Sequence, residues 1–203
     1  NYLVRINTPE AYEVVSTGVN LQKTAEDNGR QTHIIEANNV RDFSVAILHD
    51  YKELNQATGL TTVRLYTPNK NSYGADLILD DAADMLNYFS CKFGSYPYED
   101  FKVVFVPMQG FQGMEYAGLI FLKDEFLKPN YRLSNQRFIL AHEIAHQWWY
   151  GMVGNDQIRE PWLDEGLANW SAYKYFQEMD GQITGLNEPS RRVNLAKELK
   201  DIY

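Results

Sequence analysis

The sequence contains one cysteine, Cys91, in 203 residues, and it has fewer basic side chains (19 Lys and Arg) than acidic ones (27 Asp and Glu). A single cysteine cannot form an internal disulfide, so the fold does not depend on an oxidising compartment. We expect Cys91 to be a small buried apolar side chain. The formal net charge of -8 repels phosphate backbones, which argues against nucleic acid as a partner.

Long apolar segments, internal repeats and runs of charge are also absent. No stretch approaches the roughly 18 uninterrupted apolar residues that span a bilayer, and the first residues lack the pattern of a secretory signal. We therefore expect no membrane contact from this segment, and the compartment stays open. Because the sequence starts at Asn1 without methionine and stops at Tyr203 in an amphipathic run, we interpret it as a fragment cut at both ends.

A β-rich first part is followed by segments with helical periodicity. Enrichment in β-branched and aromatic residues predicts strands at 11–17, 31–36, 43–49 and 61–67, with a hairpin turn at Asn28-Gly29. Helices are predicted at 75–93, at 134–150 and from Pro161 to about Gly181, and two further strands at 101–107 and 118–122. We expect an α+β fold in which 1–58 ends a β domain and 59–203 forms a second domain.

One of these helices carries a candidate metal site. His142 and His146 are four residues apart, so both imidazoles lie on one helix face and can bind one metal ion. Glu143 lies about 100° around the helix, beside such an ion, where a base is needed. The alternative is a chance grouping of these residues on a core helix.

A third ligand is predicted on the next helix. Eighteen residues separate His146 from Glu165, which lies near the start of that helix. Two imidazoles and one carboxylate leave the fourth tetrahedral position of Zn²⁺ open for water, as in catalytic zinc sites. Zinc lowers the pKa of that water towards about 7, and Glu143 would accept its proton and pass it to a leaving amine. The predicted reaction is hydrolysis of a peptide or similar amide bond.

The HExxH motif, the spacing to Glu165 and the run WLDEGLANW resemble the aminopeptidase N type of zinc metallopeptidases, which are thermolysin-like gluzincins. The segment QGMEY at 112–116 is similar to the GAMEN substrate motif of that family. The resemblance implies one zinc ion, peptide substrates, and a catalytic lobe with a small mixed sheet packed on the two motif helices. It also implies that Glu115, flanked by Gly113 and Met114, binds the free amino terminus of the substrate.

Two residues depart from the family motif, namely Gln112 for its first glycine and Tyr116 for its asparagine. Both flank Glu115, so they leave open an endopeptidase that does not select free amino termini. A third alternative is a binding module that keeps the fold without catalysis. The resemblance further implies a tyrosine that stabilises the oxyanion beyond Tyr203, so this chain alone is expected to bind zinc with little activity.

Other polar and aromatic residues near the motif carry weaker predictions. Asn169 is a candidate to hydrogen-bond a ligand imidazole, whereas Asp164 is expected to interact with the dipole of its helix. Core packing is expected for the four tryptophans of the motif helices, Trp148, Trp149, Trp162 and Trp170. The alternative interpretation of Glu115 is an ordinary solvated glutamate in a loop.

Overall fold

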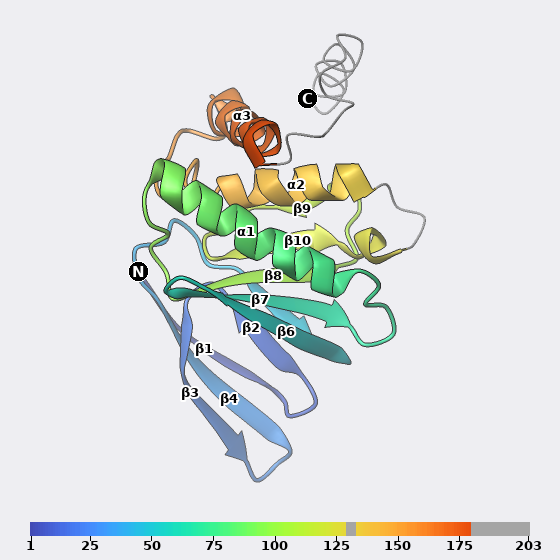
Figure 1. Cartoon of the computed structure of the whole chain (residues 1–203). Helices are drawn as coiled ribbons and strands as arrows, with labels where there is room; N and C mark the ends of the chain where they lie inside the picture. The colour runs from blue at the N-terminus through green and yellow to red at the C-terminus, as the bar shows by residue number, and fades with distance from the viewer. Residues whose placement is uncertain (129–132, 180–203) are drawn as a thin grey trace.

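The computed structural model describes residues 1–128 and 133–179, with side chains from 135 in the second segment, and it has a mixed α+β fold (Figure 1). Its described helices are α1 (Ala75–Phe93), α2 (Leu133–Ala145) and α3 (Pro161–Met179), with a short 3₁₀ helix at Asp124–Leu127. The expected end of the last helix at Gly181 lies outside the described residues.

The described strands form three sheets. A sheet in the order β1-β4-β3 contains β1 (Tyr2–Pro9), β3 (Val19–Glu26) and β4 (Arg30–Ala37), and a pair contains β2 (Glu13–Ser16) and β5 (Val45–Leu48). The third sheet has the order β6-β7-β8-β10-β9 and contains β6 (Tyr51–Thr58), β7 (Thr61–Pro68), β8 (Asp100–Val106), β9 (Gly113–Met114) and β10 (Leu119–Lys123). In this third sheet β8 runs parallel to both neighbours and the two outer pairs are antiparallel, so the expected mixed sheet is present.

All predicted strands are confirmed, but β1, β3 and β6 were missed. Strands β3 and β6 are largely exposed and mostly polar, so no apolar enrichment marked them in the sequence, whereas β1 was missed although it contains Leu3, Val4 and Ile6. The predicted Asn28-Gly29 turn joins β3 to β4, and Gly29 adopts a φ of 72° that favours glycine. Strands β6 and β7 pair around a tight turn. The predicted domain boundary at residue 58 lies at this turn. Because hydrogen bonds join the two sides of that boundary, we propose a division ahead of Tyr51 instead.

The main core lies between the five-stranded sheet and the three helices, which Figure 1 shows on one side of that sheet. The predicted bounds of α1 are confirmed, and its inner face packs Met85, Leu86 and Phe89 against the sheet, while Leu77 is exposed. A second cluster covers the opposite face and joins Val15 and other residues of β2 and β5 to the sheet. Helix α1 packs over β6 and β7, whereas α2 lies beside β9 and β10.

Helix α2 ends earlier than expected, at Ala145 instead of about Tyr150. After it the chain makes successive tight turns, in which the N–H of Gly151 donates to the carbonyl of His146 at 2.9 Å. Tyr150 adopts a φ of 123°, which is not helical. His146 still donates its N–H to the carbonyl of His142 at 3.2 Å, so the two histidines keep nearly helical spacing.

Some expectations for single side chains were wrong. Cys91 is exposed on α1, because it lies on the face away from the sheet. Trp148 and Trp149 pack into or against the core as expected, but Trp162 and Trp170 are 65% and 49% exposed. No helix in the described part of the chain is long and apolar enough to cross a membrane.

Candidate active site

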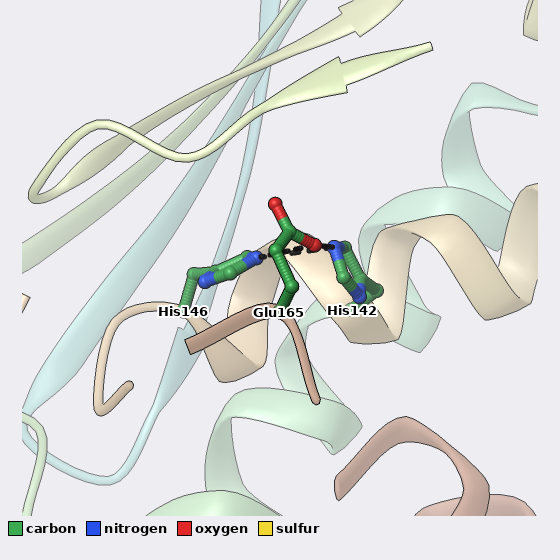
Figure 2. A group of neighbouring side chains, drawn as sticks. All are labelled: His142, His146 and Glu165. Carbon is green, nitrogen blue, oxygen red and sulfur yellow. Dashed lines mark hydrogen bonds and ion pairs between the residues drawn. The ribbon is translucent and has the colours of Figure 1, made fainter. Parts of the chain in front are cut away.

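His142, His146 and Glu165 converge where the end of α2 meets the first turn of α3 (Figure 2). The Nε2 atoms of the two histidines are 3.1 Å apart. Oε2 of Glu165 lies 3.2 Å from Nε2 of His142 and 3.7 Å from Nε2 of His146. Three donor atoms from two helices therefore face a common point.

The donor set fits a tetrahedral metal ion. At a Zn–N or Zn–O distance of about 2.0–2.1 Å, tetrahedral angles place ligand atoms about 3.3–3.4 Å apart, within the range of the three separations above. Imidazole nitrogen with carboxylate oxygen is also a donor combination that Zn²⁺ favours. The triad can thus hold one zinc ion without rearrangement of its helices.

The hydrogen bond of His146 specifies which nitrogen is free. Nδ1 of His146 lies 2.9 Å from the carbonyl oxygen of Trp149, and because a carbonyl only accepts, Nδ1 carries the proton. Nε2 is then the nitrogen that points toward Glu165 and His142 and is available to a metal ion. Nδ1 of His142 is buried without a hydrogen-bond partner among the described residues. The hydrogen bond predicted between Asn169 and a ligand imidazole is not present in that part of the structure.

Glu143 is 5% exposed and lies under the strand β9. A Cβ atom at Gly113 would overlap the carboxyl group of Glu143, so the β9 backbone lies directly against it. Oε2 of Glu143 is buried and has no hydrogen-bond partner in the described structure. An unpartnered buried carboxylate oxygen is costly unless a ligand or water meets it, which makes Glu143 a candidate functional group.

Burial is the main cause that raises the pKa of Glu143, to about 8, and the charges of Glu115 and Glu165 add to it while His146 opposes it. Hydrogen bonds from His142 and His146 outweigh the effect of burial on Glu165 and hold its pKa well below its usual range. Burial lowers the pKa of His142. Burial also favours a lower pKa for His146, but the hydrogen bond to Glu165 and the nearby carboxylates outweigh it and raise this pKa to about 9. The carboxyl groups of Glu115, Glu143 and Glu165 thus lie close enough to the imidazoles to influence their pKa, a setting that suits a cation.

Glu115 directly follows β9, which lies at the edge of the five-stranded sheet. Its carboxylate Oε1 accepts a hydrogen bond of 3.3 Å from Nε2 of Gln157. The same amide donates at 2.7 Å to Asp164, which also accepts from Asn155 at 2.8 Å. Asp164 lies in the first turn of α3, as expected, and is also a buried acceptor for two amides.

Gln147, two residues after the end of α2, joins this helix end to the segment that carries Glu115. Its Oε1 accepts from the N–H of Gly118 at 2.8 Å, and its Nε2 donates to the carbonyl of Tyr116 at 3.2 Å. The ring of Tyr116 packs edge-on against Phe121, with centroids 5.5 Å apart. Gly113, Met114 and Glu115 are therefore held close to α2, although about thirty residues separate them in the sequence.

Gln147, Asn155 and Gln157 were missed in the sequence. A glutamine or asparagine has no periodic or motif signal of its own, and only its position beside HExxH or WLDEG could have drawn attention to it. Their roles depend on contacts between segments that the chain fold brings together.

Comparison with known proteins places the chain among peptidases. Residues 77–201 match the peptidase family M1 domain. The chain is 28% identical to aminopeptidase M1-B of Oryza sativa subsp. japonica over 182 residues, which cover 85% of the chain and 21% of that protein. It is 31% identical to aminopeptidase M1-A of the same plant, over 62% of the chain and 15% of that protein. It is also 28% identical to aminopeptidase 2 of Candida albicans, over 63% of the chain and 14% of that protein. The chain thus spans about a fifth or less of the length of these relatives.

Proposed function

The chain belongs to peptidase family M1, a family of aminopeptidase N-type metallopeptidases, and from this premise we propose that it forms the zinc-binding part of an aminopeptidase. The single observation that carries the proposal is the convergence of His142, His146 and Glu165 beside the buried carboxylate of Glu143. The surrounding sheet and helices would be the amino-terminal lobe of a thermolysin-like catalytic domain.

In this proposal Nε2 of both histidines and Oε2 of Glu165 hold the zinc ion. When bound, zinc acidifies a water molecule and polarises the peptide carbonyl. Glu143, buried beside the three ligands with an unpartnered Oε2, would accept a proton from water and then deliver it to the leaving amine. The β9 backbone covers Glu143 and excludes bulk water from its carboxyl group.

Glu115 supplies the selection of free amino termini. A carboxylate that meets an ammonium group forms a charge-assisted hydrogen bond, which is stronger than a neutral one. Gln157 donates to one oxygen of Glu115 and so orients the carboxylate. The edge position of β9 also allows a peptide to bind as an added strand. The proposed substrates are therefore peptides with a free amino terminus.

The test compares one short peptide with a free amino terminus and the same peptide acetylated, with and without a zinc chelator, using the intact protein that carries this chain. We expect cleavage of only the free peptide, and loss of cleavage with chelator. Replacement of Glu143 by Gln should keep bound zinc and lower turnover about 10²- to 10⁴-fold, the usual contribution of a general base. Normal turnover in that variant would refute the role of Glu143.

The same measurements separate the alternatives. Equal cleavage of both peptides would identify an endopeptidase, to which Gln112 and Tyr116 would then be relevant. Zinc binding without cleavage of either peptide would identify a binding module.

A further inference from the structure

The peptide bond between Trp149 and Tyr150 connects the metal site to a distant segment of the chain. The carbonyl oxygen of this peptide accepts the Nδ1 hydrogen bond of His146. Its orientation is coupled to the φ angle of Tyr150, which is 123°. A positive φ is unfavourable for an aromatic residue, so other contacts must stabilise it.

Those contacts come from the segment 38–44 between β4 and β5. The hydroxyl of Tyr150 donates a hydrogen bond to the carboxylate of Asp42. The guanidinium of Arg41 lies over the Tyr150 ring, 5.9 Å from its centroid, and occupies the space that a side chain at Gly154 would need. Burial and the Asp42 carboxylate raise the pKa of Tyr150, so its hydroxyl remains a donor.

Trp149, the other residue of this peptide, is also held in place by hydrogen bonds. Its indole N–H donates to the hydroxyl of Ser171 on α3 at 2.8 Å, the helix that carries Glu165. The N–H of Tyr150 donates to the carbonyl of Val153 at 2.9 Å, which closes the loop. With both neighbours fixed, the peptide between them has one orientation, toward His146.

We infer that Tyr150 and Asp42 are positioning residues for His146. Their hydrogen bond holds the 149–150 peptide so that the Trp149 carbonyl fixes the Nδ1-protonated tautomer and leaves Nε2 free for the metal. The inference rests on the proposed zinc site and adds residues that do not touch the ion. It also makes the β-rich first part of the chain contribute to metal affinity.

The first test measures zinc affinity of the intact protein by competition with a chromogenic chelator. Tyr150→Phe and Asp42→Asn should each weaken zinc binding about tenfold, the lower end of the effect seen when an outer partner of a ligand histidine is lost. Tyr98→Phe is the matched control, because it removes a tyrosine hydrogen bond of 3.0 Å to the carbonyl of Asn39 in the same segment. This control should bind zinc like the wild type.

A second pair of variants tests the backbone mechanism itself. Tyr150→Ala and Tyr150→Gly both remove the hydroxyl and ring, but glycine adopts a positive φ without steric penalty. The glycine variant should therefore bind zinc several-fold more tightly than the alanine variant. Equal affinities in these two variants would overturn the inference, because they would show that the φ of residue 150 does not affect the metal site.

The tautomer gives a readout that does not require metal. Imidazole ¹⁵N chemical shifts of the zinc-free protein, recorded at a pH high enough for the His146 ring to be neutral, should show His146 protonated at Nδ1 in the wild type and a mixture of tautomers in Tyr150→Phe. Unchanged shifts and unchanged affinity in Tyr150→Phe would refute the positioning role while leaving the zinc site intact. Failure of the wild type to bind zinc would instead overturn both this inference and the proposed function.

Discussion

The backbone of Gly113 lies against the carboxyl group of Glu143, with no space between them for even a methyl group. This contact joins the edge strand β9 to the last turn of α2. It explains why a glycine occupies the first strand position ahead of Met114 and Glu115: any side chain there would displace the proposed base.

Gly113→Ala should therefore lower peptidase turnover while zinc binding is retained. The added methyl group displaces the Glu143 carboxyl, and a misplacement of about 1 Å can reduce the rate about 10²-fold. Turnover and bound zinc per protein would be measured together. Gly166→Ala on α3 is the control, because a Cβ atom there meets open space. Wild-type turnover in Gly113→Ala would show that Glu143 does not need its present position.

Glu115→Gln should weaken the use of peptides with a free amino terminus. Loss of a hydrogen bond to a charged group costs about 1.5–3 kcal/mol, so kcat/KM for such a peptide should fall about 10- to 150-fold. Glu160→Gln, at an exposed position before α3, is the control and should leave kcat/KM for the same peptide unchanged. An unchanged kcat/KM in Glu115→Gln would contradict a role in amine recognition.

Zinc should raise the thermal stability of the intact protein through this site. A ligand that binds only the folded state at about one hundred times its Kd adds about 2.7 kcal/mol to the free energy of unfolding. Glu165→Gln should abolish most of this gain, whereas Glu160→Gln, in the exposed loop before α3, should keep it. Differential scanning calorimetry with and without zinc measures the gain. An undiminished gain in Glu165→Gln would place the ion elsewhere.

His33 should make the stability of the β-rich part depend on pH. It is fully buried in β4, and burial together with the charge of Lys23 lowers its pKa below the usual value of 6.5. The unfolded chain takes up a proton near pH 6.5, but the folded chain does so only at lower pH. The stability that neutral His33 provides is therefore complete above about pH 6.5 and is lost as the pH falls through the folded pKa.

Urea unfolding between pH 7.5 and 5 would measure this dependence. His33→Leu should flatten the loss of stability on acidification, since Nε2 of His33 has no hydrogen-bond partner in the described structure. His49→Leu, at an exposed position after β5, is the control and should keep the slope of the wild type. A slope that survives in His33→Leu would assign the acid sensitivity to other groups.

Local periodicity was enough to predict much of the fold. The bounds of α1 and the start of α3 at Pro161 follow from helical spacing, a first-turn proline and a glycine just beyond Phe93. Strands β3 and β6 could not be found this way, because their side chains are mostly polar and exposed and only pairing with a neighbour makes them strands. The early end of α2 was missed for a similar reason, since the turns after Ala145 are fixed by contacts with other segments.

The sequence by itself determined the chemistry available to this protein: two histidines one helical turn apart, the glutamate between them and the carboxylate of the next helix. Those relations are local or belong to a known motif, so they do not require knowledge of the fold. Only the tertiary structure decided that Glu143 is buried under Gly113, that Gln157 orients Glu115, and that Asp42 holds Tyr150 beside the metal helix. These contacts join residues far apart in the chain, and their burial and hydrogen bonding depend on how the sheets and helices pack.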